Sequence, residues 1–526
     1  MTPEGGGVLD NLVVGTGHAG IAAAMALRAQ GRAFEVVDLG FDLPSDRRRE
    51  VEGLAALPPD RWDRATTRRL FPAPAASRSG VAARLAFGSD FVYRPSPFLE
   101  VIARGAEVKV SHAFGGFGNV WGGAMLPWGP RSLSSWPLPP SEMADAYRRV
   151  LDYVPLAAEH DDLAHDFPLH TDAPVPMRRS PWTEAILGGL HRRRDALARD
   201  GVRVGRARMA VDAAGGVTGC RYCARCLDGC AYDALFNPRT LWRRLEGEGA
   251  TLHRGWYACA LEEDDDVVHL TARNVRDGST RRFTTRRLYL ATGQLSTARI
   301  LLRSLGAFDR AVRVADSQYF FFPLLLWRGL DAPVDFTLAE AFAEVSDDRI
   351  TTRDVHLQLY APNDIILDTI RSTLPGLVPT GWLERRFVLV QGFLHSDDSA
   401  HLELTVRAPR DGHDRVEVAG VENPRAMRVA RAVQRVLRRR LRGLGLVPPT
   451  PPTLVAPGRS FHTGASFPMG GDDPLTSSDL QGRPAGLRRT HIVDAAAFPD
   501  VAGSTIAFTI MAHADRVVRA SGPDTA

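Results

Sequence analysis

Hydrophobic and polar positions near the start of the chain follow the order strand, helix, strand. An apolar run at residues 11–14 leads into a glycine-rich turn, and an Ala- and Leu-rich stretch then continues to Gly31. A second apolar run, 34–37, closes at Asp38. This order predicts a βαβ unit with an acidic residue about 20 positions after the glycines, the context that makes a glycine motif informative.

The rest of the chain shows two kinds of pattern: one continues the strand-and-helix order of the N-terminal unit, and the other consists of alternating strands. Residues 288–292 predict a buried strand, and a helix should follow through Leu302. Alternating patterns at 355–360, 386–393 and 401–407 predict antiparallel strands, and glycine-rich character returns after residue 457. We therefore expect an α/β fold with two domains. A discontinuous Rossmann-like domain would span 1–312 and 457–526, and an inserted α+β substrate-binding domain would span 313–456. The stretch from Leu43 to Ser96, rich in Arg, Pro and Ala, predicts irregular structure.

The glycine turn itself has the residues that a dinucleotide requires. Gly15 permits the tight turn, Gly17 lets the backbone approach a pyrophosphate, and Gly20 allows the helix to lie close to the strand. Asp38 would accept hydrogen bonds from ribose hydroxyls. The N-terminus of the helix offers backbone amides and a positive dipole to an anion, and it begins with His18 and Ala19.

Charge and hydropathy exclude several other classes of protein. The 526 residues contain 65 basic and 61 acidic side chains, a net charge of +4, and the basic residues are scattered; the lone lysine is Lys109. The densest basic run, 428–442, has apolar residues at helical spacing, which favours a solvated helix face over nucleic-acid binding. No signal peptide opens the chain, and the most apolar stretch, 319–327, is far shorter than the roughly 20 residues of a membrane span. We therefore expect a cytoplasmic protein without a transmembrane segment.

Further motifs resemble those of the glucose–methanol–choline oxidoreductases along most of the chain. Residues 115–123 (GGFGNVWGG) resemble the second glycine loop of that family, which lies along the flavin. Residues 291–293 with 297–302 resemble the segment that closes over the adenosine. His462, followed by Met-Gly at 469–470, by IVDA at 492–495 and by TIMA at 509–512, resembles the C-terminal signature.

This resemblance implies an FAD-dependent enzyme that oxidises an alcohol to a carbonyl. Val120 stands where some relatives carry a histidine bonded to the flavin, so FAD should be held noncovalently. Beyond the first turn, the resemblance implies contacts with FAD from Gly116, Asn119, Gly122, Gly123, Thr292, Gly293, Asp494, Ala495 and Thr505.

The resemblance also identifies the residues that would carry the chemistry. His462 matches the catalytic base of the family, and histidine suits the role because its pKa is near neutrality. Thr505 occupies the position of the usual second His or Asn, and a hydroxyl is much less basic than imidazole. Either Thr505 positions the substrate and His462 works alone, or another group supplies the second contact. His395 is one candidate for that group, although an exposed structural histidine at a strand end is the interpretation we favour for it. The departure at Thr505 keeps open a non-oxidative lyase or isomerase on the same flavin scaffold.

Four cysteines form the second unusual motif, within residues 218–232. Their spacing, C-x2-C-x2-C-x3-C, predicts a compact loop around an iron–sulfur cluster, either 4Fe-4S or 3Fe-4S. Zinc is an alternative, although its sites usually use two separated pairs of ligands, and unligated thiols are another. The residues are Cys220, Cys223, Cys226 and Cys230.

The function expected from the sequence is therefore a flavin-dependent dehydrogenase. It would act on a small-molecule alcohol, sugar-like or from secondary metabolism, with electrons leaving through the cluster to a partner protein or a quinone. An oxidase that uses O₂ and holds a structural metal is the other alternative, besides the lyase or isomerase.

Overall fold

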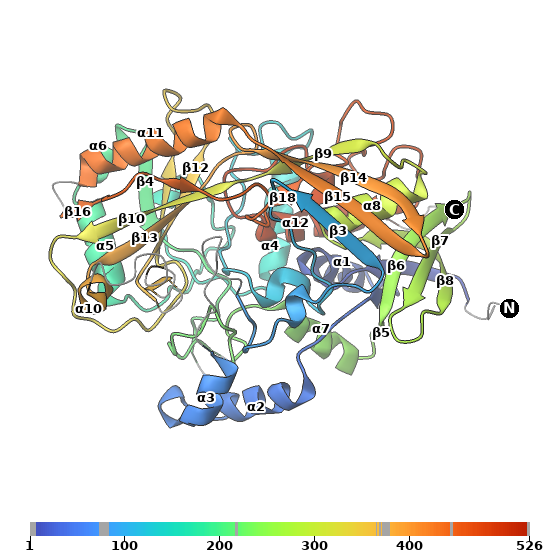
Figure 1. Ribbon diagram of the computed structural model, residues 1–526, viewed down its shortest axis with the longest axis horizontal. Coiled ribbons are helices and arrows are strands. Elements are labelled where there is room, and N and C mark those ends of the chain that lie inside the picture. Colours follow the sequence, from blue (N-terminus) through green and yellow to red (C-terminus); the bar gives the residue numbers. More distant parts are fainter. Residues whose placement is uncertain are drawn as a thin grey trace.

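The computed structural model describes residues 7–72, 84–215, 219–363, 366, 367, 370, 379–441 and 445–522. Residue 218 of the predicted cysteine loop and Arg442 of the basic run lie outside these residues. The described strands form three sheets, with helices on their faces (Figure 1).

The first sheet is the dinucleotide-binding half. Its strands lie in the order β5 (Thr251–Arg254), β2 (Glu35–Asp38), β1 (Leu9–Val14), β8 (Thr280–Leu290), β7 (Val268–Asn274) and β6 (Trp256–Glu263), and β19 (Thr490–Ile492) also pairs with β8. β1 runs parallel to β2 and to β8. Helix α1 (His18–Ala29) connects β1 to β2, which confirms the predicted βαβ unit.

Helix α1 fits closely because most of its buried residues are alanines. Ala22, Ala23 and Ala24 are fully buried, and small side chains let the helix approach its neighbours closely. It packs against α12 (Ala507–Ala520), which in turn packs against α4 (Pro140–Leu151). The N-terminal unit and the C-terminal helix therefore share one core. The helix predicted after residue 292 is α8 (Gln294–Ser304).

Two of the three predicted antiparallel strands, those at 355–360 and 386–393, lie in the second sheet, and the third, at 401–407, lies in β14 (His401–Arg410) of the third sheet. The order of the second sheet is β16 (Leu446–Val447), β10 (Tyr319–Leu326), β13 (Phe387–Phe393), β12 (Val355–Tyr360), β11 (Ala341–Val345) and β4 (Val202–Arg206), and β17 (Thr453–Leu454) also pairs with β10. Helix α11 (Pro424–Leu441) runs along this half of the molecule (Figure 1) and buries Val429, Val433 and Leu437. The basic run is thus an amphipathic helix, as predicted.

A third sheet has the order β18 (Thr463–Gly464), β9 (Ala311–Asp316), β14 (His401–Arg410), β15 (His413–Val421) and β3 (Leu99–Arg104). The sheets do not divide at the predicted boundaries. The second sheet includes β4, which precedes residue 313, and the third sheet includes β14 and β15, which lie within 313–456. The domain boundaries at 312/313 and 456/457 stay a prediction.

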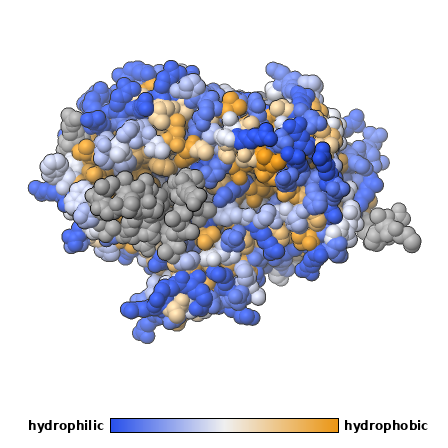
Figure 2. Space-filling view, viewed as in Figure 1, coloured by the Kyte–Doolittle hydropathy of each residue, from blue (hydrophilic) through white to orange (hydrophobic). Residues whose placement is uncertain are grey.

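One expectation about the N-terminal third was wrong. The stretch from Leu43 to Ser96 contains α2 (Ser45–Ala55) and α3 (Arg64–Leu70), not only irregular chain. These helices form an arm at the bottom of Figure 1, and hydrophilic residues cover most of it in Figure 2. In α2 only Leu54 is buried, so the sequence offered almost no apolar periodicity from which to predict a helix.

Candidate active site

A cavity of about 600 Å³ lies between the first and second sheets. Its lining includes the turn from Gly15 to Ala19 and Asp38 on the side of the first sheet. It also includes His462, Thr505 and side chains of β10, β12 and β13. The structure therefore brings the predicted dinucleotide turn and the predicted base to the same cavity.

The three glycines of the first turn have distinct surroundings. Gly15 has a φ of +103°, and a Cβ there would lie 2.5 Å from the carbonyl oxygen of Ala291. A Cβ on Gly20 would collide with the carbonyl of Gly15. Gly17 differs, because no other atom lies within 4 Å of its Cβ position. Gly15 and Gly20 are thus required by the fold, whereas the space beside Gly17 is open to a ligand.

Asp38 and Thr16 lie side by side at the ends of β2 and β1. The Thr16 hydroxyl donates to the Asp38 carboxylate and accepts the backbone N–H of Gly115 at 2.9 Å. Burial raises the pKa of Asp38 to about 7, although the Thr16 hydrogen bond opposes this shift. The carboxyl group lines the cavity, where it can accept hydrogen bonds from a ligand's hydroxyls.

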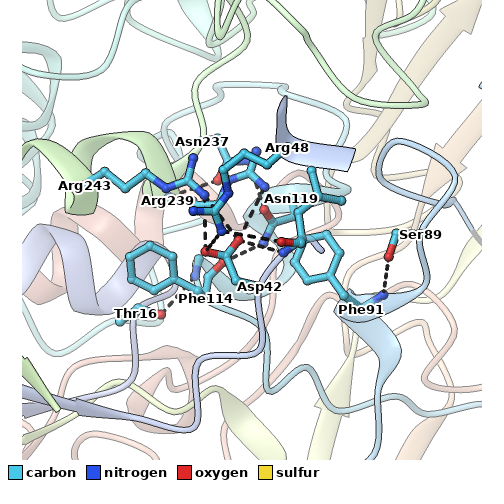
Figure 3. A network of polar contacts seen from close by, with 12 residues as sticks. Thr16, Asp42, Arg48, Ser89, Phe91, Phe114, Asn119, Asn237, Arg239 and Arg243 are labelled. Carbon is cyan, nitrogen blue, oxygen red and sulfur yellow. Dashed lines mark hydrogen bonds and ion pairs between the residues drawn. The ribbon is translucent and has the colours of Figure 1, made fainter. Parts of the chain in front are cut away.

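The second glycine loop contacts the first turn directly. A Cβ on Gly116 would lie 3.4 Å from the Cα of Gly17. The Asn119 side chain donates to the carbonyl oxygens of Phe114 and Gly116, at 2.9 and 2.8 Å, and accepts from the Asn237 amide at 3.1 Å (Figure 3). Asn119 thus holds the loop by internal hydrogen bonds, and Gly122 and Gly123 continue it along the cavity.

Asn237 extends this network to α7 (Pro238–Gly247). Its side chain caps the helix by accepting the backbone N–H of Arg239 at 3.0 Å. Arg243 of the same helix and Arg48 of α2 both pair with Asp42, at 3.2 and 2.8 Å (Figure 3). The second glycine loop is therefore anchored to the start of α7 through Asn119 and Asn237.

Asp494 serves mainly to connect segments of the cavity wall. It accepts the backbone N–H groups of Gly293, at 2.8 Å, and of Ala496, at 2.9 Å, and also the Thr297 hydroxyl, at 2.5 Å. Thr297 in turn hydrogen-bonds Thr292 at 2.8 Å. Burial raises the pKa of Asp494 to about 6. Thr292, Gly293, Asp494 and Ala495 all line the cavity.

His462 is positioned by its backbone and by a ring contact. The backbone N–H of His462 donates to the Ser460 hydroxyl at 3.0 Å, and that hydroxyl donates to the Asp316 carboxylate at 2.7 Å. Its ring lies parallel to Phe393, with 5.1 Å between centroids. Burial lowers the pKa of His462 to about 4, so the imidazole is neutral at pH 7. Its Nδ1 is buried without a hydrogen-bond partner among the described residues.

Thr505 also belongs to the cavity wall. Its hydroxyl is buried and also lacks a partner within the described chain. Its carbonyl oxygen accepts the indole N–H of Trp128 at 3.0 Å, which fixes the backbone there. Two buried polar atoms without a described partner, one from each residue, therefore lie in the wall of the cavity.

His395 does not provide the second group at this site. It is 2% exposed, contrary to the expected exposed strand end, and it is absent from the cavity lining. Its Nδ1 accepts the backbone N–H of Asp397 at 3.1 Å, and its Nε2 is 3.7 Å from Asp500. These contacts give it a structural role.

The structure does not support the predicted iron–sulfur cluster, nor the zinc alternative. Within the described residues, no three His, Cys, Asp or Glu side chains are arranged to hold a metal ion. Burial raises the pKa of Cys220 and Cys226 to about 12 and that of Cys223 to about 11, and it raises the pKa of Cys230 as well. These directions hold for the thiols without a metal ion. The spacing of cysteines along the chain does not by itself establish the geometry that a metal ion or cluster requires.

Several cavity residues were missed by the sequence analysis. Alternate residues of the second sheet face the cavity, and so do one arginine and one lysine from the first half of the chain. The alternating pattern of the strands was visible, but not which face would meet the cavity. The residues are Arg84, Tyr93, Lys109, Tyr319, Gln358 and Tyr360.

Comparison with known proteins supports the fold. A crystal structure of pyridoxine 4-oxidase from Mesorbium loti matches with a TM-score of 0.59 and 15% sequence identity, over 97% of this chain and 99% of that one. The two chains share a fold. This full-length match confirms the predicted fold class. No protein-family model matches the sequence, and the search of curated proteins found no relative. The resemblance to the glucose–methanol–choline family beyond the fold stays a prediction.

No helix in the described parts of the chain has both the length and the apolar character to cross a membrane.

Proposed function

We propose that this protein is an FAD-dependent oxidoreductase that oxidises a small-molecule alcohol to a carbonyl compound. The observation that carries the proposal is the shared cavity, which is lined both by the dinucleotide turn at Gly17 and by His462, whose buried Nδ1 has no partner among the described residues. The structural neighbour is named as an oxidase of pyridoxine, which is an alcohol.

The residues present fit a dinucleotide cofactor. The space beside Gly17 is open, and the α1 N-terminus points its amides toward a site for an anion. The Nε2 atom of His18, the first residue of α1, is buried without a partner in the described structure, as expected for a donor or acceptor that a ligand completes. Asp38 would bind the ribose, while Gly116 and Gly122 would lie along the rest of the cofactor. Val120 offers no group for a covalent bond, so FAD would be held noncovalently.

Bound FAD supplies the chemistry of a hydride acceptor. His462 accepts the hydroxyl proton at Nδ1, because its pKa is lowered by burial and the ring is neutral at pH 7. The Thr505 hydroxyl forms a hydrogen bond with the substrate hydroxyl, as donor or as acceptor, and so orients the alcohol. Phe393, parallel to the imidazole, keeps the ring in place.

We assign the four cysteines no part in this mechanism, because no group of side chains that could hold a metal ion is found among the described residues. The final electron acceptor is then a molecule that reaches the cavity, and the name of the structural neighbour favours O₂.

Anaerobic mixing tests the proposal and its alternatives. Benzyl alcohol and other hydroxymethyl compounds should bleach the flavin absorbance near 450 nm in a single turnover, roughly the band of oxidised FAD. Readmitted air should restore the band and yield peroxide if the protein is an oxidase. Product formation without any bleaching would contradict oxidation and indicate a lyase or isomerase.

A further inference from the structure

The second sheet presents a face to the cavity that consists of aromatic and amide side chains. Alternate residues of three neighbouring strands line the cavity: Tyr319 and Phe321 of β10, Gln358 and Tyr360 of β12, and Leu389, Gln391 and Phe393 of β13. Because alternate residues of a strand point to the same side, these side chains form one surface. Phe393 also contacts His462, so this surface lies beside the proposed base.

Arg84 lines the same part of the cavity. Its Nη1 lies 3.5 Å from the carbonyl oxygen of Val120, and its guanidinium hydrogen-bonds the Tyr360 side chain. Its charge also acts on Tyr93 and Tyr319. Within the described residues no carboxylate pairs with this guanidinium, although most arginines that line the cavity have one.

Lys109 adds a second cation from another segment. Its ammonium nitrogen lies 4.4 Å from the centre of the Tyr93 ring, and no described carboxylate pairs with it. It is the lone lysine in a chain of 65 basic residues, and it faces the cavity. A lysine has a compact charge that can approach a ligand where the wider guanidinium of arginine cannot.

The three described acidic residues of the cavity lining bond to groups other than Arg84 and Lys109. Glu107 pairs with Arg459 at 2.8 Å. Asp38 and Asp494 belong to the dinucleotide half, where they bond to Thr16 and Gly293. The cofactor's pyrophosphate is expected at the α1 N-terminus, whereas Arg84 contacts Tyr360 of the second sheet. Among the residues that the structure describes, no carboxylate is therefore left to compensate the charge of Arg84 and Lys109 beside this sheet, and the pyrophosphate is expected elsewhere.

We propose that the substrate is an alcohol that also carries a carboxylate, and that Arg84 and Lys109 bind this carboxylate. The proposal rests on the proposed function, since it assigns the substrate class of the same cavity. A cation in a partly desolvated cavity forms strong hydrogen bonds with a carboxylate, and arginine can do so with two parallel bonds. Tyr319, Tyr360 and Phe393 would cover an aromatic or other planar part of the substrate.

The test compares two compounds of nearly equal shape and different charge on the holoprotein. Calorimetry should show that 4-(hydroxymethyl)benzoate binds at least about 10-fold more tightly than 4-(hydroxymethyl)benzamide, the usual scale of a charge-assisted bond. Arg84→Gln should remove most of this preference, and Lys109→Gln should reduce it. The control is Arg276→Gln, an exposed arginine outside the cavity, which should leave the preference unchanged.

The FAD content and the thermal unfolding of each variant are measured first, so that loss of folding is recognised. Lys109→Gln provides an independent test if Arg84→Gln does not fold. Equal affinity of acid and amide, including no measurable binding of either, would overturn the proposal, and so would an unchanged preference in Arg84→Gln. Because calorimetry does not require flavin reduction, this result is separate from a failure of the proposed function, which would appear as protein without FAD or as product without bleaching.

Discussion

The imidazole of His462 lies nearly parallel to the ring of Phe393, with an interplanar angle of 17° and 5.1 Å between the centroids. Phe393 belongs to β13 of the second sheet, whereas His462 immediately precedes β18 of the third sheet. The contact therefore joins these two sheets at the proposed base. It also removes water from the ring, and burial is the cause of the lowered pKa of His462.

The first prediction concerns pH. An ordinary histidine base loses activity as the pH falls through about 6.5. Because burial lowers the pKa of His462 to about 4, its neutral form persists to lower pH. The rate of anaerobic flavin reduction at subsaturating alcohol should thus stay level from pH 8 to about pH 5 and decline only as the pH approaches 4. A decline centred near pH 6.5 in stopped-flow measurements would contradict this account of the base.

Replacement of the base should slow the chemistry without releasing the cofactor. His462→Ala should reduce the rate of flavin reduction by about 10²–10⁴-fold, the usual contribution of a positioned acid–base group, at unchanged FAD content. Thr505→Ala should cost less than about 10-fold, since its hydroxyl only orients the alcohol. The matched control is His191→Ala, at the exposed end of α5 (Pro181–His191). Single-turnover reduction by His462→Ala at the wild-type rate would place the base elsewhere.

The open space beside Gly17 makes a sharp prediction for cofactor binding. Gly17→Val should fold, because no protein atom lies within 4 Å of the new Cβ, yet the side chain would fill the space that the pyrophosphate needs. The purified variant should contain little or no flavin. Gly53→Val is the control, because Gly53 also has open space at its Cβ position and lies far from the cavity in α2. Full flavin content in Gly17→Val would show that the turn does not bind the cofactor.

The cysteines provide a prediction that reverses the one made from their spacing. Their thiols are buried in part and their pKa values are raised by burial, so iodoacetamide should label them slowly at pH 8 in the folded protein and rapidly in urea. Protein purified without air should contain neither stoichiometric iron and labile sulfide nor zinc. Iron with labile sulfide, or zinc, at one equivalent or more in the wild type and absent from Cys223→Ser would contradict this prediction and support a metal centre at the cysteines.

The features that were predicted correctly depend on residues close together in the sequence, whereas most of those that were missed depend on contacts between distant segments. The βαβ unit around Gly15 and Gly17 and the strands at 355–360, 386–393 and 401–407 follow from short-range periodicity, and the structure confirms them. Asn119 and Asp494 were identified as cofactor contacts, but the structure shows them bonded chiefly to the protein itself. Arg84 could not be found, because its contact with Tyr360 joins segments far apart in the sequence. The arrangement of the thiols and the burial of His395 likewise depend on tertiary contacts.

The central claim is that FAD occupies this cavity without a covalent bond, and acid precipitation of the purified protein tests it most directly. About one equivalent of FAD should appear in the supernatant, identified by chromatography, because Val120 has no nucleophilic group at the position where some relatives of the resembled family carry the flavin-bonded histidine. Flavin that stays in the protein pellet would contradict noncovalent binding. Absence of flavin from both fractions, even after the protein is incubated with FAD, would contradict the proposed function itself.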